Sequence, residues 1–188
     1  MKSIAVFCGS KSGNGNIYME TAKKLGEKLA SEKITLVYGG AQVGCMGSVA
    51  DAALKYGGKV IGVIPEKLRD VEIAHNQLTE LHVVDTMHER KAMMADLADA
   101  FLALPGGAGT LEEWFEVFTW AQLGYHNKPC ALLNVDGFFD PLISMLDHTI
   151  EKGFMSESYR EMILIASNQE ELFEKLENYR PIYATKWT

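Results

Sequence analysis

Six short apolar segments alternate with six segments of helical spacing along most of the chain. Strands are expected at residues 3–8, 34–39, 59–65, 79–85, 100–105 and 129–135. Helices are expected at residues 16–33, 43–57, 87–98, 110–123, 140–153 and 168–179. Strands that alternate with helices predict a parallel sheet with helices on both faces, and unbroken apolar runs fit strands buried on both sides. The expected fold class is therefore α/β, with three layers.

Length and composition predict one globular domain at residues 1–180, followed by a tail at residues 181–188. The 188 residues carry a formal net charge of −7, which argues against nucleic acid as a partner. Three scattered cysteines, Cys8, Cys45 and Cys130, favour a reducing, cytoplasmic compartment. No apolar run is long enough to cross a membrane, and the five histidines lack metal-ligand spacing, so we expect neither a membrane nor a metal.

Three joints between a strand and the next helix are rich in glycine: 8–16 (CGSKSGNGN), 38–47 (YGGAQVGCMG) and 104–110 (LPGGAGT). In an open parallel sheet such joints lie at the carboxyl ends of the strands, where ligands bind. Glycine lets backbone N–H groups face an anion, and the N-terminus of the next helix adds partial positive charge. One such joint is better explained as a tight turn, but three together favour a phosphate-binding site.

The glycine spacing narrows the class of phosphate ligand. No joint has the pattern G-x-G-x-x-G, and the second strand ends at Tyr38, Gly39 and Gly40 rather than at an acidic residue, which argues against a dinucleotide. The Gly-Lys-Ser/Thr sequence of a P-loop does not occur either. The sequence therefore favours a mononucleotide or a sugar phosphate.

Charged residues at two expected helix starts are candidates for the site. Arg90 and Lys91 lie where the helix dipole disfavours cations, which hints at an anionic ligand, although a solvated basic pair is the plainer explanation. Residues 110–113 match a capping box, with Thr110 as the N-cap and Glu113 at N3. Beside a phosphate loop, the Glu113 carboxylate can instead stabilise positive charge on a sugar or orient a water molecule. The residues leave these two roles of Glu113 open.

Four aromatic residues lie on more than one face of the helix expected at residues 110–123. They are Trp114, Phe115, Phe118 and Trp120. Helices that are apolar all round are buried. We therefore expect this helix to contribute to the core on one side and to a subunit interface on the other.

Two stretches, MHERK (87–91) and PGGAGTLEE (105–113), form a recognisable combination, and the second meets the motif P-G-G-x-G-T-x-x-E. The sequence in this respect resembles the LONELY GUY (LOG) family of cytokinin-activating phosphoribohydrolases, formerly mislabelled as lysine decarboxylases. Further matching blocks include FCGSKSG, YGGAQVGCMG, VIGVIP, LTELHVVDTMHERK and FTWAQLGYHNKPCALLNVDGFF. The resemblance thus covers nearly the whole chain, and nothing in the residues indicates a pyridoxal-phosphate site.

The resemblance implies a Rossmann-like nucleotide-binding fold and a homodimer with the active site near the subunit interface. It implies hydrolysis of the N-glycosidic bond of a purine nucleoside 5′-monophosphate, such as AMP or isopentenyladenosine monophosphate, to the free base and ribose 5-phosphate. No cofactor is implied. Arg90 and Glu113 match the catalytic pair of the family. The residues that match substrate-binding positions are Ser10, Glu72, Lys91, Gly106, Gly107, Gly109, Thr110, Glu112 and Thr119.

Two other classes of function remain open. A nucleotide or molybdenum-cofactor carrier on the same fold has no need for the Arg90 and Glu113 pair. A structural oligomer would use Glu113 only as a helix cap. Departures from the family at Lys11, Ala41 and Cys45 concern the first two glycine joints, so they bear on loop geometry and substrate preference.

Overall fold

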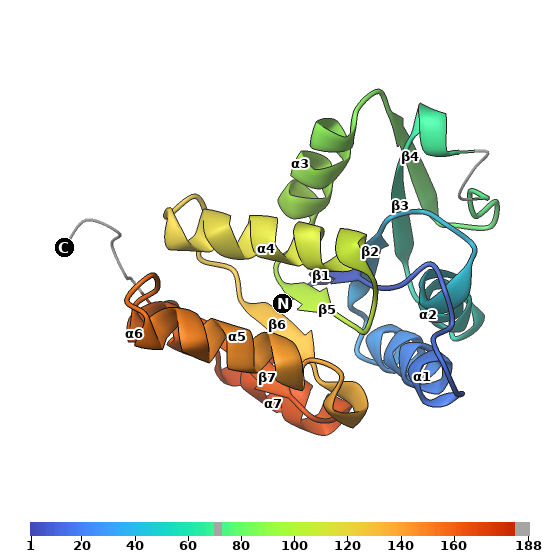
Figure 1. Cartoon of the computed structure of the whole chain (residues 1–188). Coiled ribbons are helices and arrows are strands. Elements are labelled where there is room, and N and C mark those ends of the chain that lie inside the picture. Colours follow the sequence, from blue (N-terminus) through green and yellow to red (C-terminus); the bar gives the residue numbers. More distant parts are fainter. Residues whose placement is uncertain (70–72, 183–188) are drawn as a thin grey trace.

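A seven-stranded parallel sheet forms the centre of the protein, in a computed structural model that describes residues 1–69 and 73–182 (Figure 1). The strand order is β4-β3-β2-β1-β5-β6-β7. The strands are β1 (Ser3–Phe7), β2 (Thr35–Tyr38), β3 (Val60–Pro65), β4 (Glu80–Val84), β5 (Phe101–Ala103), β6 (Cys130–Leu133) and β7 (Ile163–Ala166). The helices are α1 (Ile17–Ser31), α2 (Gly44–Lys55), α3 (Met87–Leu97), α4 (Ala108–Gln122), α5 (Asp140–Glu151), α6 (Glu157–Glu161) and α7 (Gln169–Asn178), with 3₁₀ turns η1 (Glu66–Leu68) and η2 (Val135–Gly137).

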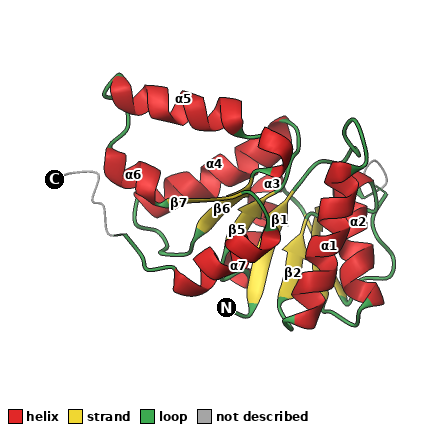
Figure 2. Cartoon of the chain, turned by 90° about the horizontal axis from the view of Figure 1, so that it is seen from below, coloured by secondary structure: helices red, strands yellow, loops and turns green. Residues whose placement is uncertain are grey.

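Helices cover both faces of the sheet, which confirms the three-layer α/β fold (Figure 2). Apolar residues of α1, α2 and α7 pack on one face, and those of α3, α4 and α5 pack on the other. Successive strand residues point to opposite faces. Accordingly, Ile4 and Val6 of β1 join the first core cluster, whereas Ala5 and Phe7 join the second. The inner strands are buried on both sides, which explains their unbroken apolar sequences.

The strand order reverses between β1 and β5. The chain builds β1 to β4 outward on one side and then crosses to place β5, β6 and β7 on the other. Loops that leave β1 and β5 diverge at such a switch point, and ligands bind in the crevice between them. Gly9 N donates to the Pro105 carbonyl at 3.1 Å, and Cys45 N donates to the Gly9 carbonyl at 3.0 Å. The three glycine-rich joints therefore lie together, as expected from the sequence.

Two elements were not expected, the strand β7 and the short helix α6. Strand β7 has four residues, and no glycine or proline separates it from α6 before it. Strand β7 nevertheless pairs with β6 from Cys130 to Leu133 and completes this edge of the sheet. The other observed bounds fall within a few residues of the expected ones. Of the expected tail, residues 183–188 lie outside the described residues.

Candidate active site

A cavity of about 310 Å³ opens at the carboxyl ends of β1 and β5, within the size range of small-molecule sites, about 300–1,000 Å³. It is lined by the first and third glycine-rich joints and by side chains of α2, η1, α3 and α4. The lining residues are Cys8, Gly9, Ser10, Met46, Leu68, Met87, Arg90, Gly107, Ala108, Gly109, Thr110, Glu112 and Glu113. A second cavity of about 330 Å³ adjoins it, shares Gly9, Ser10 and Gly107, and reaches Gly106.

Arg90 extends from α3 to the carboxyl end of β2, and its side chain is only 6% exposed. Its Nη2 donates a hydrogen bond to the Gly39 carbonyl at 3.3 Å, and its Nη1 lies 3.8 Å from the sulfur of Met87. A Cβ at position 39 would collide with Nη2, so Gly39 leaves the space that the guanidinium occupies. Gly39 therefore serves a contact with a side chain from a distant helix, which the sequence Tyr-Gly-Gly did not indicate.

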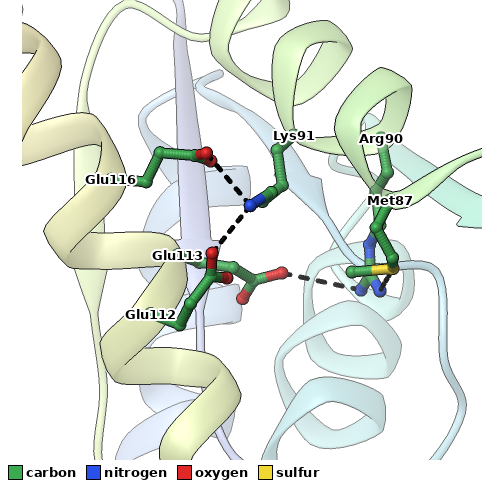
Figure 3. A network of polar contacts seen from close by, with 6 residues as sticks. All are labelled: Met87, Arg90, Lys91, Glu112, Glu113 and Glu116. Atoms are coloured by element: carbon green, nitrogen blue, oxygen red, sulfur yellow. Dashed lines mark hydrogen bonds and ion pairs between the residues drawn. The ribbon is translucent and has the colours of Figure 1, made fainter.

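Glu113 of α4 faces Arg90 of α3 across the cavity (Figure 3). Its Oε1 lies 3.9 Å from Arg90 Nη2, and its side chain is 14% exposed. A carboxylate and a guanidinium at this separation attract each other, and both retain access to a ligand in the cavity. The structure thus brings together the two residues that the sequence singled out as a pair.

The capping box that the sequence left open for Thr110 and Glu113 is contradicted by the start of α4. Helix α4 begins at Ala108 with Gly107 as its N-cap, so Thr110 lies inside the first turn and is buried. An N-cap residue has non-helical backbone angles, whereas Thr110 lies within the helix. The side chain of Glu113 faces Arg90 instead of returning to the helix start. This geometry removes the structural explanation for Glu113 that the sequence left open.

A cap similar to a capping box occurs at the start of α3, with Thr86 as the N-cap. The Thr86 hydroxyl accepts a hydrogen bond from Glu89 N at 3.1 Å, and Glu89 Oε2 accepts one from Asp85 N at 2.9 Å. These bonds satisfy backbone donors at the N-terminus. They fix the first turn of the helix, from which Arg90 and Lys91 project.

The N-terminus of α4 borders the cavity without a side-chain cap. Gly107 has no side chain, and Gly107, Ala108 and Gly109 are exposed. The first N–H groups of a helix have no intrahelical partner and carry partial positive charge, so this end of α4 is suited to an anion. A Cβ on Gly106 would collide with the hydroxyl of Thr110, which explains why the loop needs glycine there.

Lys91 bridges α3 and α4 (Figure 3) and does not itself line the cavity. Its Nζ lies 2.7 Å from Glu112 Oε1 and 3.0 Å from Glu116 Oε1. Burial lowers the pKa of Lys91, but the hydrogen bonds to these two carboxylates outweigh it, and the net pKa is raised. The ammonium therefore stays charged. Among the described residues, neither Lys91 nor Thr119, which is exposed on α4, lines the two cavities.

The remaining expected site residues are Ser10, Glu112 and Glu72. Ser10 lines both cavities and Glu112 lines the first. Glu72 lies outside the described residues. The cavity also includes apolar side chains that the sequence did not single out, namely Met46, Leu68 and Met87. Such residues have no short motif, because distant elements bring them together.

Cys8 lines the cavity but is held as a neutral thiol. Burial raises its pKa well above the ordinary value, and Cys45 and Glu113 raise it further. The thiolate is the nucleophilic form of cysteine, so this environment disfavours covalent chemistry at Cys8. Within residues 1–69 and 73–182, no group of three or more His, Cys, Asp or Glu side chains is arranged for a metal ion. Likewise, none of the described helices has the length and apolar character to cross a bilayer.

The aromatic residues of α4 lie partly in the core. Trp114 is fully buried, donates from Nε1 to the Ala131 carbonyl at 3.1 Å, and stacks on Phe118 with ring centroids 5.1 Å apart. Phe115 and Trp120 are only partly buried. The core side of α4 is therefore confirmed, whereas a subunit interface on the other side stays a prediction.

Comparison with known structures shows the fold. The molybdenum cofactor binding protein of Rippkaea orientalis superposes with a TM-score of 0.70 and 22% identity, covering 94% of this chain and 95% of that one. A molybdenum cofactor carrier protein of Chlamydomonas reinhardtii gives a TM-score of 0.71 and 19% identity, covering 94% and 96%. At this identity the likeness establishes a shared Rossmann-like fold and nothing about ligands.

Comparison with sequences shows the family. A family model described as "Possible lysine decarboxylase" matches residues 46–176. The cytokinin riboside 5′-monophosphate phosphoribohydrolase of Rhodococcoides fascians is 52% identical, over 90% of this chain and 86% of the relative. The enzyme of the same name from Arabidopsis thaliana is 50% identical, over 96% of this chain and 84% of the relative. The chain belongs to the LONELY GUY family of cytokinin riboside 5′-monophosphate phosphoribohydrolases.

Proposed function

We propose that the protein hydrolyses the N-glycosidic bond of purine nucleoside 5′-monophosphates. The substrates are AMP or N6-modified forms such as isopentenyladenosine monophosphate, and the products are the free base and ribose 5-phosphate. The observation that carries this proposal is the opposition of Arg90 and Glu113 beside an uncapped helix N-terminus in one cavity. Relatives that are about half identical carry the corresponding enzyme name.

The phosphate of the substrate binds at the N-terminus of α4. Gly107, Gly109 and Thr110 line the cavity there, and Ser10 adds a hydroxyl from the opposite loop. Backbone N–H groups and the helix dipole favour a dianion at this position, even though the protein as a whole is acidic. Gly106 keeps the loop close to Thr110.

Arg90 and Glu113 act on the ribose. Cleavage of the glycosidic bond leaves the bonding electron pair on the base, which takes up a proton, and builds oxocarbenium character at C1′ of the ribose. The Glu113 carboxylate stabilises that charge and orients the water that attacks C1′, while that water loses a proton. Arg90 holds substrate oxygens by charge-assisted hydrogen bonds and keeps C1′ aligned with Glu113.

We further propose that the protein is a cytoplasmic homodimer with the site near the subunit interface. The dimer is supported by apolar surface at the end of the helix that carries Glu113. Leu123 is 42% exposed and Tyr125 is 77% exposed, beside the partly buried Trp120. Exposed apolar residues that cluster in this way are typical of protein–protein contacts. Sedimentation velocity at micromolar concentration measures the assembly directly, and a monomer would contradict this part.

The hydrolase proposal is tested by comparing substrates with and without phosphate. Purified protein is incubated with AMP, isopentenyladenosine monophosphate, and the two matching nucleosides, and released base is measured by chromatography. We expect base from the monophosphates and at least about 10²-fold less from the nucleosides, because the phosphate contacts supply alignment. Tight binding of a monophosphate without any base release would favour a nucleotide carrier on this fold.

A further inference from the structure

Lys91 is adjacent to Arg90 in sequence but contacts a different set of groups. Its Nζ is held by Glu112 and Glu116, and its side chain is only 11% exposed. We propose that Lys91 is a positioning residue, which clamps α3 to α4 and so keeps Arg90 opposite Glu113, and that it does not contact the substrate. The inference rests on the proposed function for its link to catalysis.

The two helices are joined by paired ionic contacts. Neighbours on α3, Arg90 and Lys91, meet neighbours on α4, Glu113 and Glu112, at 3.9 and 2.7 Å respectively. Adjacent residues project about 100° apart on a helix, so the contacts lie on two sides of the helix–helix seam. The contact from Lys91 to Glu116, one turn further along α4, resists rotation of that helix. A shift that separates Lys91 from its partners thus also separates Arg90 from Glu113.

Glu116 contacts this clamp through only one of its two carboxylate oxygens. Its Oε1 lies 3.0 Å from Lys91 Nζ, whereas its Oε2 is buried and has no hydrogen-bond partner among the described residues. Removing one partner of a buried ion pair leaves an uncompensated charge, which is more costly than removing both. Loss of Lys91 would therefore push the Glu116 carboxylate toward water and open the seam between the helices.

Lys91 also balances charge next to the site. Glu112, Glu113 and Glu116 place three carboxylates on two neighbouring turns of α4, and Arg90 and Lys91 are the cations from α3 that face them. Without Lys91, Glu112 and Glu116 would repel a phosphate dianion at the start of α4. A lysine that acts through these carboxylates and a lysine that binds phosphate differ in one respect. Only a lysine that acts through the carboxylates becomes dispensable when one of those carboxylates is removed as well.

The first experiment uses that difference. We expect Lys91→Met to lower kcat for AMP about 10-fold or more, since small displacements of catalytic groups are costly. Lys91→Met combined with Glu116→Gln is expected to recover most of that loss, and Lys91→Arg to retain near-normal kcat. Arg160→Met serves as the matched control, because it breaks a 2.7 Å contact to Asp147 on other helices and should leave kcat unchanged. A double variant as inactive as Lys91→Met would overturn the proposal.

The second experiment does not depend on turnover. Thermal unfolding is measured for wild type, Lys91→Met, Glu116→Gln and the double variant. One kcal/mol corresponds to a shift of about 2–4 °C in a protein of this size. We expect Lys91→Met to lower Tm by at least that amount in the wild-type background, but by much less in the Glu116→Gln background. Additive shifts would overturn the clamp. If wild type releases no base, the proposed function fails, and this cycle still decides whether the clamp exists.

A third measurement addresses phosphate contact directly. Binding of ribose 5-phosphate, used as a probe of the phosphate site, is followed by calorimetry in Lys91→Met combined with Glu116→Gln. The proposal expects an affinity within about 3-fold of wild type. Loss of a charged hydrogen bond to phosphate corresponds to about 10-fold or more, and a loss of that size would identify Lys91 as a ligand.

Discussion

Gly39 and Arg90 are fitted to each other at the carboxyl end of β2. The Gly39 carbonyl accepts a hydrogen bond from Arg90 Nη2 at 3.3 Å, and a Cβ on residue 39 would collide with the same atom. The absence of a side chain at Gly39 therefore decides where the guanidinium lies. Because Glu113 faces that guanidinium, Gly39 helps to set the geometry of the Arg90 and Glu113 pair without lining the cavity itself.

Gly39→Ala is expected to displace Arg90 while leaving the fold intact. The colliding atom is the end of a long side chain, which can move more easily than the backbone. A displacement of about 1 Å costs on the order of 10²-fold in rate, so we expect kcat/KM for AMP to fall by about that factor. Steady-state kinetics measure the loss and circular dichroism checks the fold. A folded Gly39→Ala variant with normal kinetics would show that the position of Arg90 is unimportant.

Thr110→Val tests the hydroxyl in the first turn of α4. The substitution keeps the shape of a buried side chain that lines the cavity and removes one hydrogen-bonding group. Loss of a hydrogen bond to a charged group is worth about 1.5–3 kcal/mol, so KM for AMP should rise about 10-fold or more. Thr149→Val is the matched control, since its hydroxyl donates to the Leu146 carbonyl at 2.7 Å within α5. Equal kinetics in both variants would remove Thr110 from the site.

Stability is expected to fall as the pH rises above about 9. Burial raises the pKa of Cys130 above its ordinary value of 9.0, and burial likewise raises the pKa values of Cys8 and Tyr38. In this range the unfolded chain releases protons that the folded protein retains. Each such group then removes about 1.4 kcal/mol of stability per pH unit.

The measurement is denaturant unfolding between pH 7 and pH 10.5, for wild type and for Cys130→Ala. The variant is less stable at neutral pH because it leaves a cavity, but it lacks one of the titrating groups. Its free energy of unfolding should therefore decline less steeply above pH 9 than that of wild type. Identical slopes would mean that Cys130 is not held neutral by burial.

The sequence predicted the layers of the fold better than the details of the site. Alternating segments were sufficient for six strands, because buried parallel strands are unbroken apolar runs. Strand β7 was missed, because four apolar residues after a short helix resemble the end of that helix. Its strand character comes from pairing with β6, which is a tertiary contact.

A local sequence rule failed at the start of α4. Thr110 and Glu113 match a capping box, yet α4 starts earlier, with Gly107 as an N-cap that leaves the backbone donors open. Spacing alone could not exclude a capping role for Glu113. Excluding it required the observed start of α4 and the position of Arg90, which lies on α3 and contacts Gly39 directly after β2.

The most direct test of the account is the rate at which Glu113→Gln releases base from bound AMP. Calorimetry first establishes that the variant binds AMP within about 3-fold of wild type, and single-turnover kinetics then measure base release. General acid–base groups contribute about 10²–10⁴-fold, so we expect the rate to fall by at least about 10²-fold. Glu174→Gln, exposed on α7 and outside the cavity lining, is the control and should leave the rate unchanged. Base release by Glu113→Gln at the wild-type rate would contradict the assignment of Glu113 as the catalytic carboxylate.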